Sequence, residues 1–100
     1  MKVLIQGLGE APAAIEHALK QEKPDVTYIL CSDYQLNYIY RERGYSKPNR
    51  QVVQEVARKV RTKVIFRRCN VFDPESISKA IRGILEEIEF LDNVNFDNTT

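Results

Sequence analysis

Apolar stretches alternate along this chain with amphipathic stretches, and the alternation predicts strands and helices in turn. The first apolar stretch, residues 2–6 (KVLIQ), runs directly into a turn with two glycines. Residues 26–31 (VTYILC) are β-branched and aromatic with no polar alternation after Thr27, which is typical of a strand covered on both faces. A shorter apolar stretch at residues 64–66 predicts a third strand, and Val94-Asn95-Phe96 predicts a fourth.

Three helices are predicted between these strands. The first begins near Pro12, a residue suited to a first helical turn, and ends before Lys23-Pro24-Asp25. The second begins near Pro48, and the third begins at Asp73-Pro74, where an N-cap carboxylate precedes proline. Apolar residues at spacings of three and four predict the buried faces of the last two helices. They are Val52, Val53, Val56, Ala57 and Val60 on the second helix, and Ile77, Ala80, Ile81, Ile84, Leu85 and Ile88 on the third.

Strands that alternate with helices through short connections predict a parallel sheet with helices on both faces. We therefore expect a single α/β domain over residues 1–100, with a Rossmann-like sheet of about four strands and three helices. Ligands of such sheets bind beyond the carboxyl ends of the strands. In this chain those ends are residues 7–10, 31–33, 69–73 and 97–100.

The turn after the first strand consists of Gly7, Leu8, Gly9 and Glu10. Glycines let the backbone approach a bound group closely, and the following helix offers N–H donors and the positive end of its dipole to an anion. This favours a phosphate-bearing ligand. A dinucleotide-binding fingerprint needs a third glycine where this chain has Pro12, although Asp33 stands where a ribose-binding acid follows the second strand.

The composition, 43% hydrophobic over 100 residues, is enough for one core without disulfides or metals. Cys31 and Cys69 are expected to be reduced, packed thiols, and His17 is expected on the solvent face of the first helix. No metal-ligand cluster, P-loop or catalytic triad can be assembled, so we predict no catalytic residue, no metal and no cofactor. Without a membrane-length apolar run or a secretory signal, we expect a cytoplasmic protein that does not enter a membrane.

Charge is distributed unevenly, because residues 41–68 hold ten Lys/Arg residues against two glutamates. Such a basic segment attracts nucleotides, DNA or RNA, or it forms a solvated helix face that pairs with acidic neighbours. Residues 33–47 add Tyr34, Tyr38, Tyr40 and Tyr45 among Arg41, Arg43 and Lys47. Rings next to guanidinium groups suit base stacking and phosphate pairing. Alternatively, Leu36, Ile39 and Tyr40 form a short amphipathic helix packed on the sheet or on a partner.

The order of these features resembles the CRISPR-associated Rossmann-fold (CARF) domain over most of the chain. The resemblance rests on an opening strand that ends in Gly7-Leu8-Gly9, and on Lys23-Pro24-Asp25-Val26 leading into a strand that ends Cys31-Ser32-Asp33. It continues in Val71-Phe72-Asp73-Pro74-Glu75-Ser76-Ile77 and in the C-terminal Phe96-Asp97-Asn98-Thr99-Thr100. In the family, a corresponding last strand runs into an Asp/Asn-x-Thr-Gly-Gly-Thr-Lys-like loop. This chain ends before those glycines and lysine, so we expect a domain truncated at its C-terminus.

The resemblance implies a sensor domain of antiviral defence that binds a cyclic oligoadenylate across the two-fold axis of a homodimer, with a fused effector domain reading out the binding. The residues expected to bind the ligand are Gly7, Leu8, Gly9, Glu10, Ser32, Asp33, Asp97, Asn98, Thr99 and Thr100. We expect no catalysis from these residues alone. The alternatives are an enzyme, either a nicotinamide-dependent Rossmann enzyme or a ring nuclease that cleaves its own ligand, and an interaction or nucleic-acid-binding domain that uses residues 41–68.

Overall fold

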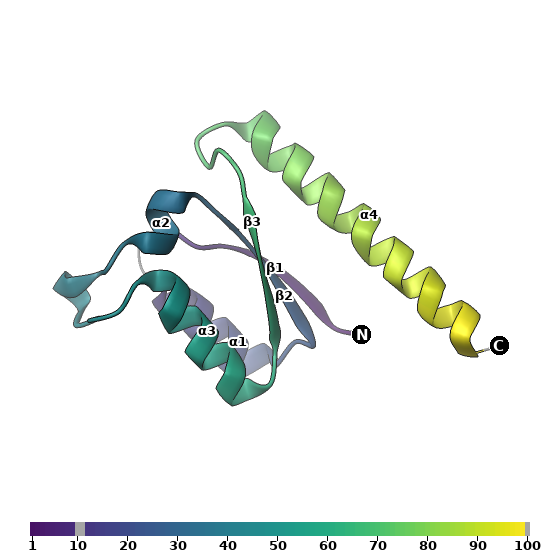
Figure 1. The fold of residues 1–100 in the computed structure, drawn as a ribbon, viewed down its shortest axis with the longest axis horizontal. Coiled ribbons are helices and arrows are strands. Elements are labelled where there is room, and N and C mark those ends of the chain that lie inside the picture. Colours follow the sequence, from purple (N-terminus) through teal and green to yellow (C-terminus); the bar gives the residue numbers. More distant parts are fainter. Residues whose placement is uncertain (10–11, 100) are drawn as a thin grey trace.

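The computed structural model describes the backbone of residues 1–9 and 12–99 and the side chains of residues 1–9 and 12–90. Strands and helices alternate as the sequence predicts (Figure 1). The elements are β1 (Val3–Gly7), α1 (Ala13–Glu22), β2 (Val26–Cys31), α2 (Asp33–Asn37), the 3-10 helix η1 (Arg41–Arg43), α3 (Asn49–Val60), β3 (Lys63–Arg68) and α4 (Pro74–Thr99).

The three strands form one parallel sheet in the order β1-β2-β3. Val3 is in register with Val26, and Val26 is in register with Lys63, so the carboxyl ends of all three strands lie at one edge. β2 occupies the centre, and from Thr27 to Cys31 each of its residues is buried. The continuous apolar run predicted this position, because a central strand is covered on both faces.

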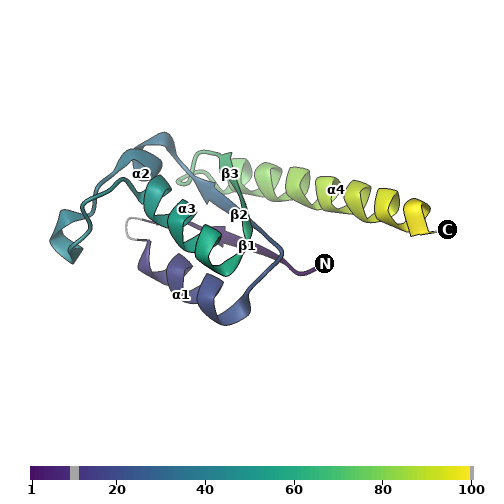
Figure 2. The ribbon, with the colours of Figure 1, turned by 60° about the horizontal axis from the view of Figure 1, so that its bottom comes forward.

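Helices cover both faces of the sheet, which confirms the Rossmann-like α/β architecture. Figures 1 and 2 show α1 and α3 on one face and α4 on the other. The core under α1 and α3 contains Leu8, Ile15, Leu19, Ile29, Cys31, Leu36, Val53, Val56 and Ala57. The core under α4 is built on Tyr28, Leu30 and Ile84, with Val3, Ile5 and Ile65 among the partly buried residues around them.

α2 lies in the segment of residues 33–47 that is rich in tyrosine, here called the tyrosine-rich connection. It packs on the sheet through Leu36, which is buried in the core. Ser32 and Gln35 form a capping box at its start, so side chains satisfy the backbone donors that a helix start leaves unpaired. The buried Asn49 donates from Nδ2 to the carbonyl of Gln35 at 2.9 Å, which fastens α2 to the start of α3. The packing interpretation of this connection is therefore correct for Leu36, although α2 ends before Ile39 and Tyr40.

α4 begins where the sequence predicts, with the Asp73 carboxylate accepting from the N–H of Glu75 at 3.1 Å. The predicted fourth strand at residues 94–96 is wrong, because α4 continues through them to Thr99. Helix propagation adds one hydrogen bond per residue once a helix exists, and the sequence has no glycine or proline after Gly83 to stop it. The predicted burial of Leu85 is also wrong, since 55% of this side chain is exposed, whereas Ile84 is buried.

Within the part of the chain that the structure describes, no helix combines the length and the apolar character needed to cross a bilayer.

Candidate functional site

The carboxyl edge of the sheet gathers the turn after β1, the start of α2 and the loop after β3, as the sequence predicts. A pocket of about 410 Å³, here called the glycine pocket, lies between these segments. Its lining residues are Gly7, Leu8, Gly9, Leu30, Gln35, Val71, Phe72 and Ile77. Gly9 has a φ of +65°, a left-handed conformation that glycine adopts without strain. A Cβ atom built on Gly7 or Gly9 meets no atom within 4 Å, so the backbone there is open to a ligand.

Leu8 is part of the structural core, contrary to the prediction that its N–H group faces a ligand. Its N–H donates to the carbonyl of Leu30 at 3.0 Å, which extends the β1-β2 pairing by one residue. Its side chain is buried with Ile15 and Ile29 under α1. The alternation of a strand explains this, because a residue that follows Gly7 in an extended chain points to the opposite face.

A second pocket of about 470 Å³ adjoins the first, since Gln35, Val71 and Phe72 line both. We call it the amide pocket, and its lining residues are Ser32, Tyr34, Gln35, Asn70, Val71 and Phe72. The Oε1 atom of Gln35 accepts from the N–H of Ser32 at 3.0 Å, and the Oδ1 atom of Asn70 accepts from the N–H of Phe72 at 3.1 Å. Both amide side chains are therefore oriented by the backbone, because only a carbonyl oxygen accepts such a bond.

Ser32 and Asp33 lie at this edge as predicted, but each has a structural partner. The Oγ atom of Ser32 accepts from the N–H of Gln35 at 3.2 Å in the capping box, which leaves its hydroxyl proton available to a further acceptor. The Asp33 carboxylate pairs with the Nε atom of Arg68 at the end of β3. Both of these side chains are mostly exposed, so the ion pair contributes little to stability and a ligand phosphate can compete for Arg68.

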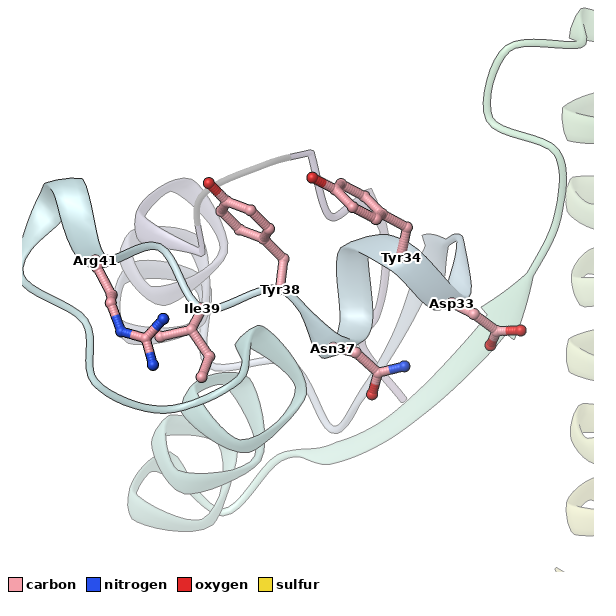
Figure 3. Close-up of a pocket in the computed structure, with 6 residues that line it drawn as sticks. All are labelled: Asp33, Tyr34, Asn37, Tyr38, Ile39 and Arg41. Carbon is pink, nitrogen blue, oxygen red and sulfur yellow. The ribbon is translucent and has the colours of Figure 1, made fainter.

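A third pocket, the tyrosine pocket of about 500 Å³, lies beside α2 and η1. It is lined by Asp33, Tyr34, Asn37, Tyr38, Ile39 and Arg41, which Figure 3 shows as sticks. The rings of Tyr34 and Tyr38 project to the same side of the chain, with centroids 5.6 Å apart, while Asp33 points away from them (Figure 3). Because Tyr34 lines both the tyrosine pocket and the amide pocket, the two pockets adjoin.

The other tyrosines of this segment have mainly packing roles. The ring of Tyr40 packs edge-on against Tyr38, with centroids 5.7 Å apart. The hydroxyl of Tyr45 donates to the Glu16 carboxylate of α1 at 2.8 Å. Burial, followed by this hydrogen bond, raises the pKa of Tyr45. Tyr45 therefore joins this connection to α1 through a hydrogen bond.

Three of the remaining predicted site residues are not brought to this edge. Asp97, Asn98 and Thr99 belong to the end of α4, which runs from the carboxyl edge back toward the side where β1 begins (Figures 1 and 2). The loop expected after a fourth strand does not form in residues 94–99, because these residues continue helix α4. Glu10 and Thr100 lie outside the described residues.

The structure places the two cysteines on opposite faces of the sheet. Cys31 is buried in the core under α1 and α3, whereas Cys69 packs under α4, so both are free thiols. Burial raises the pKa of the Cys31 thiol to about 11. His17 is exposed on α1, as predicted. Among the described residues, no group of three or more His, Cys, Asp or Glu side chains is arranged to hold a metal ion.

Three cations of the basic segment form ion pairs among the described residues. Lys47 pairs with Glu55 at 2.7 Å, Arg68 pairs with Asp33, and Arg67 on β3 pairs with Glu87 on α4. The interpretation of this segment as a solvated face that pairs with acidic neighbours therefore holds for these three residues. The nucleic-acid hypothesis for residues 41–68 stays a prediction.

Sequence reasoning did not single out Gln35, Asn70 or Phe72, which form much of the amide pocket. A signal existed for Gln35, because Ser32-x-x-Gln35 has the spacing of a capping box. Asn70 and Phe72 lie in a loop that was expected at this edge, yet no local pattern shows which loop side chains face a pocket.

Comparisons of this chain with protein-family models, with curated proteins and with solved structures each find no match.

Proposed function

We propose that this chain is the ligand-binding domain of a nucleotide sensor, and that its ligand is a cyclic oligoadenylate bound at the carboxyl edge of the sheet. The observation that carries the proposal is the open glycine turn at the end of β1, which lines the glycine pocket beside the amide pocket. This is the place where Rossmann-like sheets bind phosphate-bearing ligands. The resemblance of the sequence to CARF domains supports the choice of ligand.

Different groups at the carboxyl edge suit different parts of a nucleotide. Gly7 and Gly9 leave the backbone accessible, and Arg68 supplies a cation whose exposed ion pair with Asp33 is easily exchanged. Val71 and Phe72 supply apolar contacts, while Ser32 supplies a hydroxyl. A cyclic oligoadenylate repeats the same nucleotide unit, so we further propose that two copies of this chain bind it together around a two-fold axis.

The enzyme alternative of a nicotinamide cofactor is less well supported by this geometry. Pro12 stands in place of the third glycine of the dinucleotide-binding fingerprint, so the glycine turn is incomplete for such a cofactor. We also propose a cytoplasmic location, which the two unbridged cysteines support.

Calorimetric titration of the chain with cyclic tetra-adenylate, cyclic hexa-adenylate and NAD tests the proposal. We expect one cyclic oligoadenylate to bind per dimer, with NAD giving no heat, and the affinity to fall as salt is added. Sedimentation at tens of micromolar should show the dimer with ligand present. Absence of heat with both cyclic compounds, or binding of NAD alone, would overturn the proposal.

A further inference from the structure

Two aromatic side chains at the amide pocket are unusually exposed for their size. Phe72 is 92% exposed and Tyr34 is 71% exposed, although burying a large ring is strongly favourable. Both line the amide pocket, Tyr34 from α2 and Phe72 from the loop after β3. Rings left in water at the rim of a pocket offer stacking faces to a flat ligand.

The polar groups of the same pocket are fixed as hydrogen-bond donors. The Gln35 carbonyl oxygen is engaged by Ser32, and the Asn70 carbonyl oxygen is engaged by Phe72. Each amide therefore keeps its NH₂ group as a donor, and among the described hydrogen bonds neither NH₂ group has a partner. A flat ligand that suits this pocket carries acceptor atoms on its edge, as the ring nitrogens of a purine do.

The lining residues of the amide pocket carry no charge, and this distinguishes it from a phosphate site. The lining consists of neutral residues alone, namely Ser32, Tyr34, Gln35, Asn70, Val71 and Phe72. Arg68, at the end of β3, is not part of the lining and pairs with Asp33. A neutral heterocycle thus fits here, with its phosphate directed toward the adjoining glycine pocket or toward Arg68.

We propose that the amide pocket is a nucleobase site, in which a purine stacks against Phe72 and Tyr34 and accepts hydrogen bonds from the amides of Gln35 and Asn70. The inference rests on the proposed function, because both place a nucleotide at the carboxyl edge. It goes further by assigning the base, and not the sugar or phosphate, to this pocket.

Adenosine is the probe that tests the base site, because it carries a purine without a phosphate. We expect adenosine, followed by NMR, to shift the ring-proton signals of Phe72 and Tyr34, and ribose to leave them unchanged. Phe72→Ala and Tyr34→Leu should each weaken adenosine binding roughly tenfold, as expected when one stacking partner is removed. Phe90→Ala is the matched control, since Phe90 is also exposed (66%) but lies on α4, and it should bind adenosine normally.

A second pair of variants tests the donors without removing the loop geometry. Asn70→Asp and Gln35→Glu each keep the oxygen that accepts the backbone N–H but lose the NH₂ group. Because adenosine is uncharged, weaker binding by these variants reports the lost donor and not charge repulsion. Unchanged adenosine affinity in all four pocket variants would overturn the base site.

Failure of this inference is distinguishable from failure of the proposed function. If cyclic oligoadenylate binds and Phe72→Ala does not alter its affinity, the sensor proposal stands and the base site is wrong. If adenosine shifts both rings while cyclic oligoadenylates do not bind, the base site stands and the sensor proposal fails. If the ring signals of Phe72 change with protein concentration but do not respond to adenosine, Phe72 contacts a second copy of the chain. This result would overturn the base site.

Discussion

Gly7 and Gly9 differ in a way that decides how the glycine turn is to be tested. Gly9 has a φ of +65°, so any side chain there strains the backbone and confounds binding with stability. Gly7 has no positive φ, and an added Cβ atom meets nothing within 4 Å. A substitution at Gly7 therefore alters the space offered to a ligand while leaving the turn intact.

We expect Gly7→Val to weaken cyclic oligoadenylate binding at least tenfold, in the order of magnitude that loss of a close phosphate contact implies. Thermal unfolding should change little, and calorimetry measures the affinity. Gly83→Ala is the control, because Gly83 also has open space around it but lies on α4. It should keep its affinity and gain about 0.5–1 kcal/mol of stability from better helix propensity. An unaltered affinity for Gly7→Val would make the turn purely structural.

The two thiols should differ in reactivity because their surroundings differ. Cys31 is fully buried, and burial raises its pKa to about 11, so at pH 8 it is neither accessible nor ionised. Cys69 is partly exposed. We expect a thiol reagent such as DTNB to modify Cys69 in the native protein and Cys31 after unfolding in denaturant. Rapid modification of Cys31, the one thiol left in the Cys69→Ser variant, without denaturant would contradict this assignment.

At the scale of elements, the buried face of α4 is narrower than the apolar face that its sequence predicts. Ile84 is 1% exposed, and the next residue, Leu85, is 55% exposed. Neighbouring residues on a helix point about 100° apart, so a helix lying on a single sheet face buries one and exposes the other.

This pair provides a direct test of how α4 is rotated on the sheet. Ile84→Ala should lower the free energy of unfolding by about 2–5 kcal/mol, as is usual for a buried aliphatic side chain. Leu85→Ala should change it by less than about 0.5 kcal/mol. Denaturant unfolding of both variants measures these values. Equal losses would mean that α4 is rotated or that a partner covers Leu85.

The elements with strong local signals were predicted correctly. β2 (Val26–Cys31) has the predicted bounds, and α3 begins one residue after Pro48. The fourth strand failed because the three residues Val94-Asn95-Phe96 are too few to separate a strand from a helix, and Val94 also continues the helical spacing that begins at Ile77. The amide pocket was missed because Gln35 and Asn70 line it from segments 35 residues apart in the sequence, and no local pattern records such a tertiary relation.

At the scale of the whole molecule, an ion pair joins the sheet to α4. Arg67 on β3 pairs with Glu87 on α4 and stacks over the ring of Tyr28, 5.6 Å from its centroid. The hydrogen bond from Arg67 lowers the pKa of Glu87, with Tyr28 and Lys63 acting in the same direction against desolvation. Burial, followed by the charge of Glu87, raises the pKa of Tyr28.

This arrangement makes stability depend on pH in acid. Because the pKa of Glu87 is lower in the folded than in the unfolded chain, the ion pair stabilises the fold above the ordinary glutamate pKa. That contribution is lost as pH falls through the folded value. We expect the melting temperature of the Glu87→Gln variant to fall less than that of the parent protein between pH 6 and pH 3. The difference should be small, since both side chains are partly exposed. Parallel pH profiles would contradict the proposed role of Glu87.

The two faces of the sheet are unequally buried, and this has a consequence for motion. Nine described residues are buried under α1 and α3, against three under α4. We expect native-state hydrogen exchange to show α4 amides opening at a lower free energy than those of β2, as a separate cooperative unit. Val71 and Phe72 in the loop before α4 and Ile77 in its first turns line the glycine pocket. A ligand bound in this pocket should therefore slow amide exchange along α4 as well as at the carboxyl edge.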